Sequence, residues 1–353
     1  MNQILKKLTE GGRISADEAM HLFEAADLLE LGLAADAVCR RLHPEPFRTY
    51  VVDRNINYTN ICVSKCKFCA FYRDADSPEA YLLSDEEIHR KIAEAVELGA
   101  TQILMQGGLH PGLDISYYES LLKGIKERFD VHLHSLSPPE ITHIAKLSEL
   151  TLEQVISRLK DVGLDSIPGG GAEILTDMSR RTLSPKKCTS VEWFEVMETA
   201  HRLGMPTTAT MMFGHTESLA ERVEHLVKIR NLQDKTGGFT AFIPWTYQPD
   251  NTELGGHAVG GYEYLRTLAI SRLFLDNVKN IQASWVTQGP KIGQVALYFG
   301  ANDLGSTMIE ENVVAAAGTS FQMSEEEIRQ VIQETGFIPC RRDTYYRLLE
   351  DVT

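Results

Sequence analysis

The sequence predicts an α/β protein, built as a (β/α)8 TIM-like barrel with helices before it and a helical tail after it. Short β-rich runs alternate with amphipathic helical patterns, and polar or glycine-rich clusters follow those runs. Alternation of this kind indicates parallel strands, because each parallel step needs a crossover connection. Eight such runs favour a closed barrel, and a doubly wound open sheet is the alternative.

The elements follow in order along the chain. Residues 1–48 are expected to form a helical extension, in which Ser15 opens a capping box ahead of an apolar helical side. The barrel is expected over residues 49–320, with one of its helices near 140–162. Residues 321–353 are expected to form a helical tail packed on the barrel. The eight predicted strands are residues 50–57, 102–106, 131–136, 165–167, 207–213, 239–245, 280–285 and 303–308.

Composition narrows the function class. The 353 residues hold 35 Lys and Arg against 49 Asp and Glu, giving a net charge of −14. Such an acidic balance argues against a surface that coats nucleic acid. No apolar stretch approaches the roughly 18 residues of a membrane span, and no secretory signal is expected at the start. We therefore expect a cytoplasmic globular protein.

The strongest chemical signal is a cluster of cysteines. Cys62, Cys66 and Cys69 follow the first predicted strand directly, in a C-x3-C-x2-C pattern. Thiolates are soft ligands that suit iron–sulfur clusters or zinc, but a closed zinc site needs four ligands. Residues 54–80 contain no fourth cysteine and no histidine. Three thiolates on a 4Fe–4S cube would leave one iron open to a reactant. A zinc site completed by a distant histidine, or an iron–sulfur protein without this open iron, is the alternative.

This spacing, with the aromatic Phe68 before the last cysteine, resembles the radical S-adenosylmethionine (SAM) superfamily. The resemblance implies a 4Fe–4S cluster whose open iron chelates the amino and carboxylate groups of SAM. It further implies an external one-electron reductant, such as flavodoxin or ferredoxin. One electron then breaks SAM into methionine and a 5′-deoxyadenosyl radical, which abstracts hydrogen from the substrate. The cofactor carries this chemistry, and the protein orients it and excludes water.

Two further motifs would hold SAM under this resemblance. Gln106, Gly107 and Gly108 follow the second strand, where the superfamily carries a GG-type motif whose backbone binds the SAM amino group. The glycine-rich segment at 168–173 ends in Glu173, which would accept hydrogen bonds from the ribose hydroxyls. This run lacks the Lys-Ser/Thr of a phosphate loop, which argues against a nucleoside triphosphate site. A turn without a ligand is the alternative for both glycine motifs.

A third segment resembles the part of the superfamily that passes the adenine ring. Gly214 and Glu217 match its pattern, whereas Thr210 stands where glycine is usual and Met212 where isoleucine is usual. Tyr72, just after the cysteines, could offer its backbone to the adenine amino group. Aromatic packing over the cluster is the alternative for Tyr72.

Within the superfamily the chain is similar to the menaquinone and deazaflavin branch. Residues 57–73, 242–249 and 280–293 carry much of this similarity, which spans about residues 50–345. It implies dehypoxanthine futalosine as the small-molecule substrate. Hydrogen would be abstracted from the ribose 4′ carbon, and the ribosyl radical would add to the benzoate ring. Aminofutalosine synthase and the tyrosine-using deazaflavin-precursor synthase share the cysteine motif, so the cysteines cannot separate these enzymes.

Late loops of the barrel would bind this substrate. Trp245 and Gln248 end or follow the sixth strand, Ser284 and Trp285 lie at the seventh, and Asn302 lies at the eighth. Rigid rings with a few amides and hydroxyls suit an aromatic, polar ligand. Packing between helices is the alternative for each tryptophan.

A base must remove the ring proton after cyclisation. His134 shares a strand face with His132, and a neutral imidazole suits this work near pH 7. A hydrogen-bonded core histidine is the alternative, and Asp303 and Glu310 are rival bases. Arginines that could bind a substrate carboxylate are Arg54 and Arg73.

Overall fold

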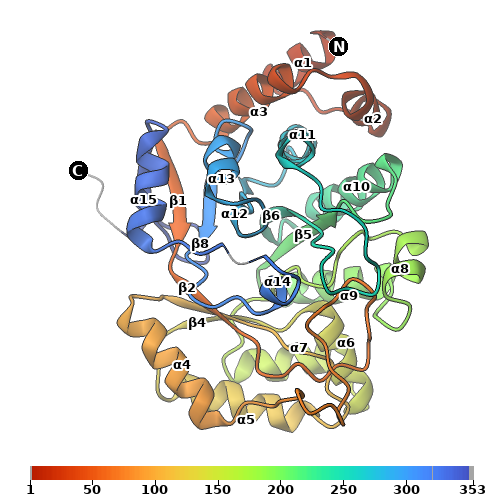
Figure 1. Ribbon diagram of the computed structural model, residues 1–353, viewed down its shortest axis with the longest axis vertical. Coiled ribbons are helices and arrows are strands. Elements are labelled where there is room, and N and C mark those ends of the chain that lie inside the picture. Colours follow the sequence, from red (N-terminus) through yellow and green to blue (C-terminus); the bar gives the residue numbers. More distant parts are fainter. Residues whose placement is uncertain (1, 320, 350–353) are drawn as a thin grey trace.

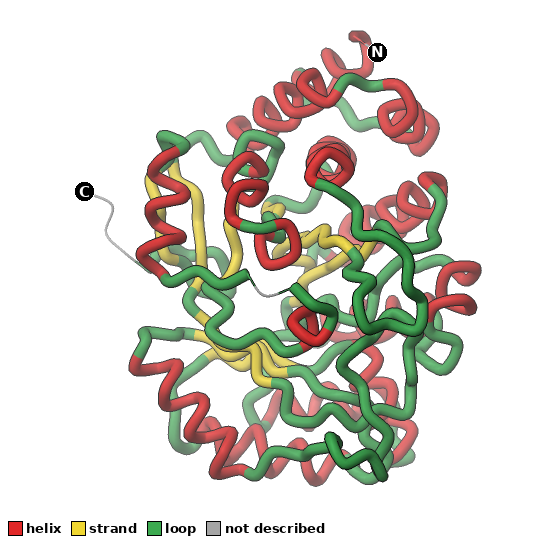
Figure 2. Tube along the Cα trace, viewed as in Figure 1, coloured by secondary structure: helices red, strands yellow, loops and turns green. Residues whose placement is uncertain are grey.

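The computed structural model describes residues 2–319 and 321–349, with strands in the centre and helices outside them (Figures 1 and 2). The strands are β1 Phe47–Val51, β2 Asp53–Ile56, β3 Gln102–Met105, β4 His132–Ser135, β5 Thr207–Phe213, β6 Phe239–Thr246, β7 Asn280–Ile281, β8 Asp303–Ser306 and β9 Ile338–Arg341. The helices are α1 Asn2–Thr9, α2 Ala16–Ala25, α3 Leu28–Leu42, α4 Asp85–Glu97, α5 Ile115–Lys126, α6 Pro138–Leu147, α7 Leu152–Asp161, α8 Asp177–Leu183, α9 Ser190–Arg202, α10 Leu219–Thr236, α11 Gly261–Phe274, α12 Trp285–Gln288, α13 Pro290–Ala296, α14 Val313–Ala316 and α15 Glu325–Glu334.

The strands form a closed parallel ring. Three sheets have the orders β2-β3-β4, β5-β6-β7 and β8-β1-β9, and every pairing in them is parallel. Single bridges connect the sheets: Ser166 pairs with β4, Ile167 with β5, and Gln282 with β8. Since only Val52 separates β1 from β2, these links complete the ring. The predicted barrel is confirmed, and its fourth strand consists of the two bridges at 166 and 167.

Residues 321–349 differ in part from the expected helical tail, and residues 350–353 of that prediction lie outside the described residues. Helix α15 is followed by β9, which pairs with β1 from Phe47 opposite Ile338 to Tyr50 opposite Arg341. The sequence does not reveal this strand, because a four-residue run containing Pro339 gains its stability only from its tertiary partner. The segment after β9 thereby becomes part of the barrel.

Two helices replace the single one expected over residues 140–162. Helix α6 ends at Leu147, and Glu149 adopts a left-handed backbone conformation with φ 53°. A helix cannot continue through such a residue. Thr151 then begins α7 with a capping box, its side chain accepting from the backbone N–H of Gln154.

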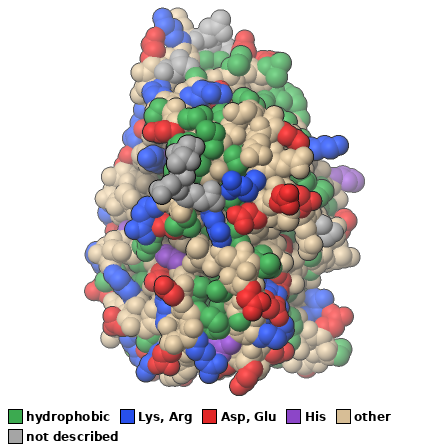
Figure 3. All heavy atoms as spheres, turned by 90° about the vertical axis from the view of Figure 1, so that its left-hand side faces the viewer, with side chains coloured by type: hydrophobic (Ala, Val, Ile, Leu, Met, Phe, Trp, Pro, Cys, Tyr) green, Lys and Arg blue, Asp and Glu red, His purple; other side chains and the backbone are tan. Residues whose placement is uncertain are grey.

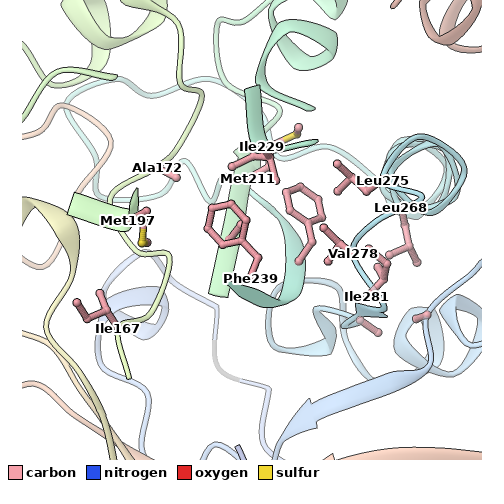
Figure 4. Close-up of a cluster of buried hydrophobic side chains, with 14 of the residues drawn as sticks. Ile167, Ala172, Met197, Met211, Ile229, Phe239, Leu268, Leu275, Val278 and Ile281 are labelled. Carbon is pink, nitrogen blue, oxygen red and sulfur yellow. The ribbon is translucent and has the colours of Figure 1, made fainter. Parts of the chain in front are cut away.

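Apolar side chains fill the layer between the strands and the outer helices. Figure 4 shows one such cluster, in which Met211 of β5 and Phe239 of β6 lie near Met197 of α9 and Leu268 of α11. All of these side chains are buried, and each contributes about 1.5–3 kcal/mol when fully buried. The N-terminal helices extend this packing, with α2 against α10 and α3 against α11, at the top of Figure 1.

Acidic and basic side chains are mixed on the face that carries α15 (Figure 3). The net charge is therefore not gathered into one patch on this face. Within the described residues, no helix combines the length and apolar character needed to cross a bilayer.

Candidate active site

A cavity of about 390 Å³ gathers most of the predicted site residues. These residues are far apart in the sequence but lie close together in space, because the carboxyl ends of parallel barrel strands open onto the same face. Predicted residues in its lining are Cys62, Cys66, Cys69, Phe68, Tyr72, Gln106, Gly107, Gly108, His134, Glu173, Trp245, Ser284 and Trp285. Predicted residues outside the lining are Gly214, Gln248, Asn302 and Asp303.

The three cysteines lie on the loop after β2, and none forms a disulfide. The backbone N–H of Cys69 donates to the carbonyl of Cys66 at 3.1 Å, and Lys67 N–H donates to Leu183 at the end of α8 at 2.9 Å. These bonds fix the loop's conformation. Burial raises the pKa of the Cys66 thiol to about 11 and also raises that of Cys69. A bound metal centre would therefore have to supply the charge that holds these sulfurs as thiolates.

The arrangement of the thiols bears on the choice between zinc and a cluster. Among residues 2–319 and 321–349, no three His, Cys, Asp or Glu side chains lie close enough together to hold one metal ion. A single zinc ion needs all its ligands within about 2.3 Å of one point. A cube instead takes each thiolate at a separate iron, so its ligands stand farther apart. The three thiols line the same cavity, and this arrangement is compatible with a cluster.

A lysine absent from the predicted site lies beside these cysteines. Lys187 lines the cavity, its Nζ 2.9 Å from Oε1 of Glu173 and 5.2 Å from the ring centre of Phe68. Burial by itself would lower the pKa of Lys187, but attraction to Cys66 in its thiolate form and to Glu173 outweighs burial and raises that pKa. A fixed cation therefore stands next to the sulfurs. Its position in the loop after α8 carries no recognisable sequence motif.

A buried carboxylate organises the GG motif. Oε1 of Glu140 accepts from the Gly107 backbone N–H at 2.9 Å and from the Tyr58 hydroxyl at 2.7 Å. Oε2 accepts from the backbone and hydroxyl of Ser137 at 2.7 and 2.6 Å. Burial raises the pKa of Glu140, opposed by these four donors. Sequence reasoning missed Glu140, which as part of a capping box looks like an ordinary helix start.

Both glycines of the motif are also required by packing. A Cβ on Gly107 would lie 2.5 Å from the Tyr58 ring, and one on Gly108 would lie 2.2 Å from the carbonyl of Ile61. Such distances are far inside van der Waals contact, so no larger residue fits. The close approach brings the GG backbone against the cysteine loop.

Asp303 does not have the surroundings of a base. It accepts from Arg342 at 2.5 and 2.9 Å and from the Thr49 hydroxyl at 2.6 Å, and it is fully buried outside the cavity lining. Asn302 is likewise engaged, its Oδ1 accepting from Arg272 at 2.7 Å. Both side chains connect structural elements rather than facing a ligand. Arg54, Arg73 and Glu310 form ion pairs outside the lining.

Gln248 and Gly214 also lie outside the lining. Gln248 accepts from the Thr319 hydroxyl at 2.9 Å. Gly214 has φ 88° and donates to Glu217 at 2.7 Å in the turn after β5. Burial would raise the pKa of Glu217, but His215, Arg222 and the Gly214 N–H outweigh it and lower that pKa to about 2. The match to the adenine-passing segment thus corresponds to a turn held by an ionised carboxylate.

Comparisons with known proteins agree with this fold. Residues 56–229 match the radical SAM superfamily, and residues 236–353 match the CofH/MqnC C-terminal region. The structure resembles an FeFe-hydrogenase maturase HydG (19% identity, TM-score 0.78, 98% of this chain and 80% of that one) and methylornithine synthase PylB (17%, 0.73, 96% and 97%). These two structural likenesses concern the fold alone.

Curated relatives are similar over nearly the whole chain. Cyclic dehypoxanthine futalosine synthase from Halalkalibacterium halodurans is 47% identical over 98% of this chain and 94% of its own. The same-named protein from Streptomyces coelicolor is 47% identical over 99% and 89%. A 5-amino-6-(D-ribitylamino)uracil–L-tyrosine 4-hydroxyphenyl transferase from Methanothermobacter thermautotrophicus is 47% identical over 96% and 95%.

A barrel with three free thiols on its cavity wall is the scaffold of a radical SAM enzyme, which uses a 4Fe–4S cluster and SAM. The chain belongs to this superfamily, and within it to the group with a CofH/MqnC C-terminal region.

Proposed function

We propose that this enzyme converts dehypoxanthine futalosine into cyclic dehypoxanthine futalosine in menaquinone biosynthesis. The observation that carries the proposal is the sequence at residues 242–249 and 280–293, which resembles this enzyme. Two proteins that bear its name in different organisms are 47% identical over 98% and 99% of the chain. The site is compatible with it, because Trp245, Trp285 and Ser284 line the same cavity as the cysteines. Aromatic walls with few polar groups suit a ribosyl benzoate.

The proposed roles of the cofactor-binding residues follow from their positions. Cys62, Cys66 and Cys69 hold the cluster. The chemistry that the bound cluster and SAM supply is abstraction of hydrogen from the substrate ribose, once an external carrier such as flavodoxin or ferredoxin has delivered an electron. Phe68, Tyr72, Gln106, Gly108 and the Gly107 backbone that Glu140 holds shape the SAM pocket. Lys187 and Glu173 place one cation and one anion at its edge.

The proposed roles toward the substrate fall to the lumen of the barrel. The two tryptophans orient the benzoate ring and exclude water, and Ser284 donates or accepts a hydrogen bond. His134 accepts the ring proton, because its imidazole lines the cavity and is neutral at pH 7, burial having lowered its pKa.

A second candidate is transfer of a 4-hydroxyphenyl group from L-tyrosine to 5-amino-6-(D-ribitylamino)uracil. A protein named for that activity is also 47% identical, over 96% of this chain. Overall identity therefore does not distinguish the two activities. A measurement of substrate turnover is needed to distinguish them.

The test is anaerobic reconstitution with iron and sulfide, followed by incubation with SAM, a reductant and each substrate. We expect 5′-deoxyadenosine and a cyclised product from dehypoxanthine futalosine, identified by mass spectrometry, and neither from tyrosine with the ribitylaminouracil. If dehypoxanthine futalosine does not react but tyrosine with the ribitylaminouracil does, the proposal is overturned in favour of the second candidate. Substituting the cysteines separately tests the cluster ligands.

A further inference from the structure

A chain of hydrogen bonds leads away from the cavity along the inside of the barrel. Nδ1 of His134 lies 2.6 Å from Oγ of Ser166, and the same Oγ lies 2.7 Å from Nε2 of His132. The two histidines alternate along β4 and so share its lumen face, whereas Leu133 between them is buried in the core. Ser166 is held beside them by its parallel bridge to His134.

One tautomer of His134 gives this chain a direction. The Thr208 hydroxyl accepts from the Gly169 N–H at 3.0 Å and lies 3.5 Å from Nε2 of His134. When Thr208 donates its own hydrogen to Nε2, that nitrogen is the unprotonated one, which is the tautomer that the relay requires. Nδ1 of His134 then carries the hydrogen and donates it to Ser166, whose hydroxyl donates to His132. Each of the three groups can both receive and pass on a proton.

We propose that His134, Ser166 and His132 form a proton relay that carries the proton of the substrate ring out of the cavity. This inference rests on the proposed cyclisation. After the carbon–carbon bond forms, the ring C–H bond breaks, its electron pair stays in the ring and its proton goes to Nε2 of His134. The Nδ1 proton moves to Ser166 and the Ser166 proton to His132. The ring would become aromatic by losing its remaining unpaired electron to a one-electron oxidant, which the oxidised form of a bound 4Fe–4S cluster would supply.

The surroundings suit transfer toward His132. His134 lines the cavity and is buried, whereas His132, the first residue of β4, is partly exposed beside the exposed Tyr345 ring, 5.2 Å between centroids. Burial lowers the pKa of His134 to about 3 and that of His132 to about 4, so both imidazoles are neutral at pH 7, and the partial exposure of His132 allows it to pass the proton to solvent. Charged groups that act on His132 are Asp165, Lys126, Asp343 and Arg347, and those acting on His134 are His132 and Arg342.

The test compares Ser166→Ala, which removes the hydroxyl, with Ser166→Thr, which keeps it. The measured quantity is the ratio of cyclic product to 5′-deoxyadenosine, because a general structural defect would lower both together. We expect this ratio to fall at least tenfold in Ser166→Ala while 5′-deoxyadenosine still forms, with an organic radical accumulating in the EPR spectrum. Ser166→Thr should restore most of the ratio. His201→Asn is a matched control, since His201 also bonds two hydroxyls, those of Thr236 and Thr207, but lies outside the cavity lining.

A wild-type ratio in Ser166→Ala, or an equal loss in His201→Asn, would overturn the relay. Nitrogen NMR of the histidines provides a readout that needs no turnover. At pH 7 we expect His134 protonated on Nδ1 only, and the opposite tautomer would overturn the relay even if Ser166→Ala failed to fold. Failure of the proposed function is distinguishable, because wild-type enzyme would then form no 5′-deoxyadenosine with dehypoxanthine futalosine.

Discussion

The ion pair between Arg342 and Asp303 gives the sharpest stability prediction. It connects β8 to the segment after β9, and the two side chains are only 5% and 0% exposed. Replacing Arg342 with Met removes the guanidinium and leaves the Asp303 carboxylate with the Thr49 hydroxyl and the Gly305 N–H as its remaining donors. An uncompensated buried charge of this kind costs about 3–5 kcal/mol.

The corresponding change in melting temperature follows from the size of the chain. Unfolding entropy near the melting temperature is about 2.1 cal/mol/K per residue, which gives about 0.7 kcal/mol/K for 353 residues. Arg342→Met should therefore lower the Tm by about 4–7 °C in anaerobic differential scanning calorimetry. Arg347→Met is the matched control, because Arg347 pairs with Asp343 at 2.6 Å but is 72% exposed. Such a surface pair contributes at most about 1 kcal/mol.

A double substitution separates the charge from the loss of packing. Arg342→Met with Asp303→Leu removes both charges, and we expect it to be more stable than Arg342→Met alone. The reasoning is refuted if Arg342→Met costs no more than Arg347→Met, or if the second substitution adds a further full loss.

Three other predictions concern single side chains. Cys66→Ala should lose both cluster absorbance and 5′-deoxyadenosine formation, whereas Cys188→Ala should keep both; equal losses would contradict the ligand assignment. Glu140→Leu removes the oxygen that accepts from the Gly107 N–H and costs about 1–3 kcal/mol for each buried donor left without a partner. SAM affinity measured by calorimetry should fall at least tenfold as Gly107 shifts, and unchanged affinity would separate Gly107 from the SAM site. Glu217, whose pKa falls from 4.5 to about 2 on folding, stabilises the protein above pH 4.5 and loses this stabilisation as pH falls toward 2. The shift corresponds to about 3 kcal/mol, so urea denaturation should show wild type losing about 2 kcal/mol more than Glu217→Gln between pH 6 and pH 3.

The helices and strands were largely predictable because their signals are local. The capping box at Ser15 begins a helix where the pattern indicated one. The fourth strand and β9 are too short to be predicted from the sequence pattern, since their stability comes from neighbours distant in sequence. Glu149 lies between α6 and α7 with a left-handed backbone conformation. No residue pattern in the sequence marks this conformation.

The site divides in the same way. Spacing alone singled out Cys62, Cys66 and Cys69, because ligands on one short loop are brought together by local geometry, and it placed the GG motif and the tryptophans at the strand ends. Lys187 and Glu140 had no motif to mark them. Asp303 matched the expected position of a base, yet its carboxylate forms an ion pair with Arg342, which lies 39 residues later in the sequence.

The sequence by itself determined the class of chemistry, since three thiols in eight positions and an alternating α/β pattern are readable residue by residue. Only the tertiary structure decided which polar side chains face the cavity, which are buried in ion pairs, and that two histidines meet over one serine. The physical reason is that hydrogen bonds and charges act between atoms a few ångströms apart in space, and a barrel places residues from remote strands at that distance.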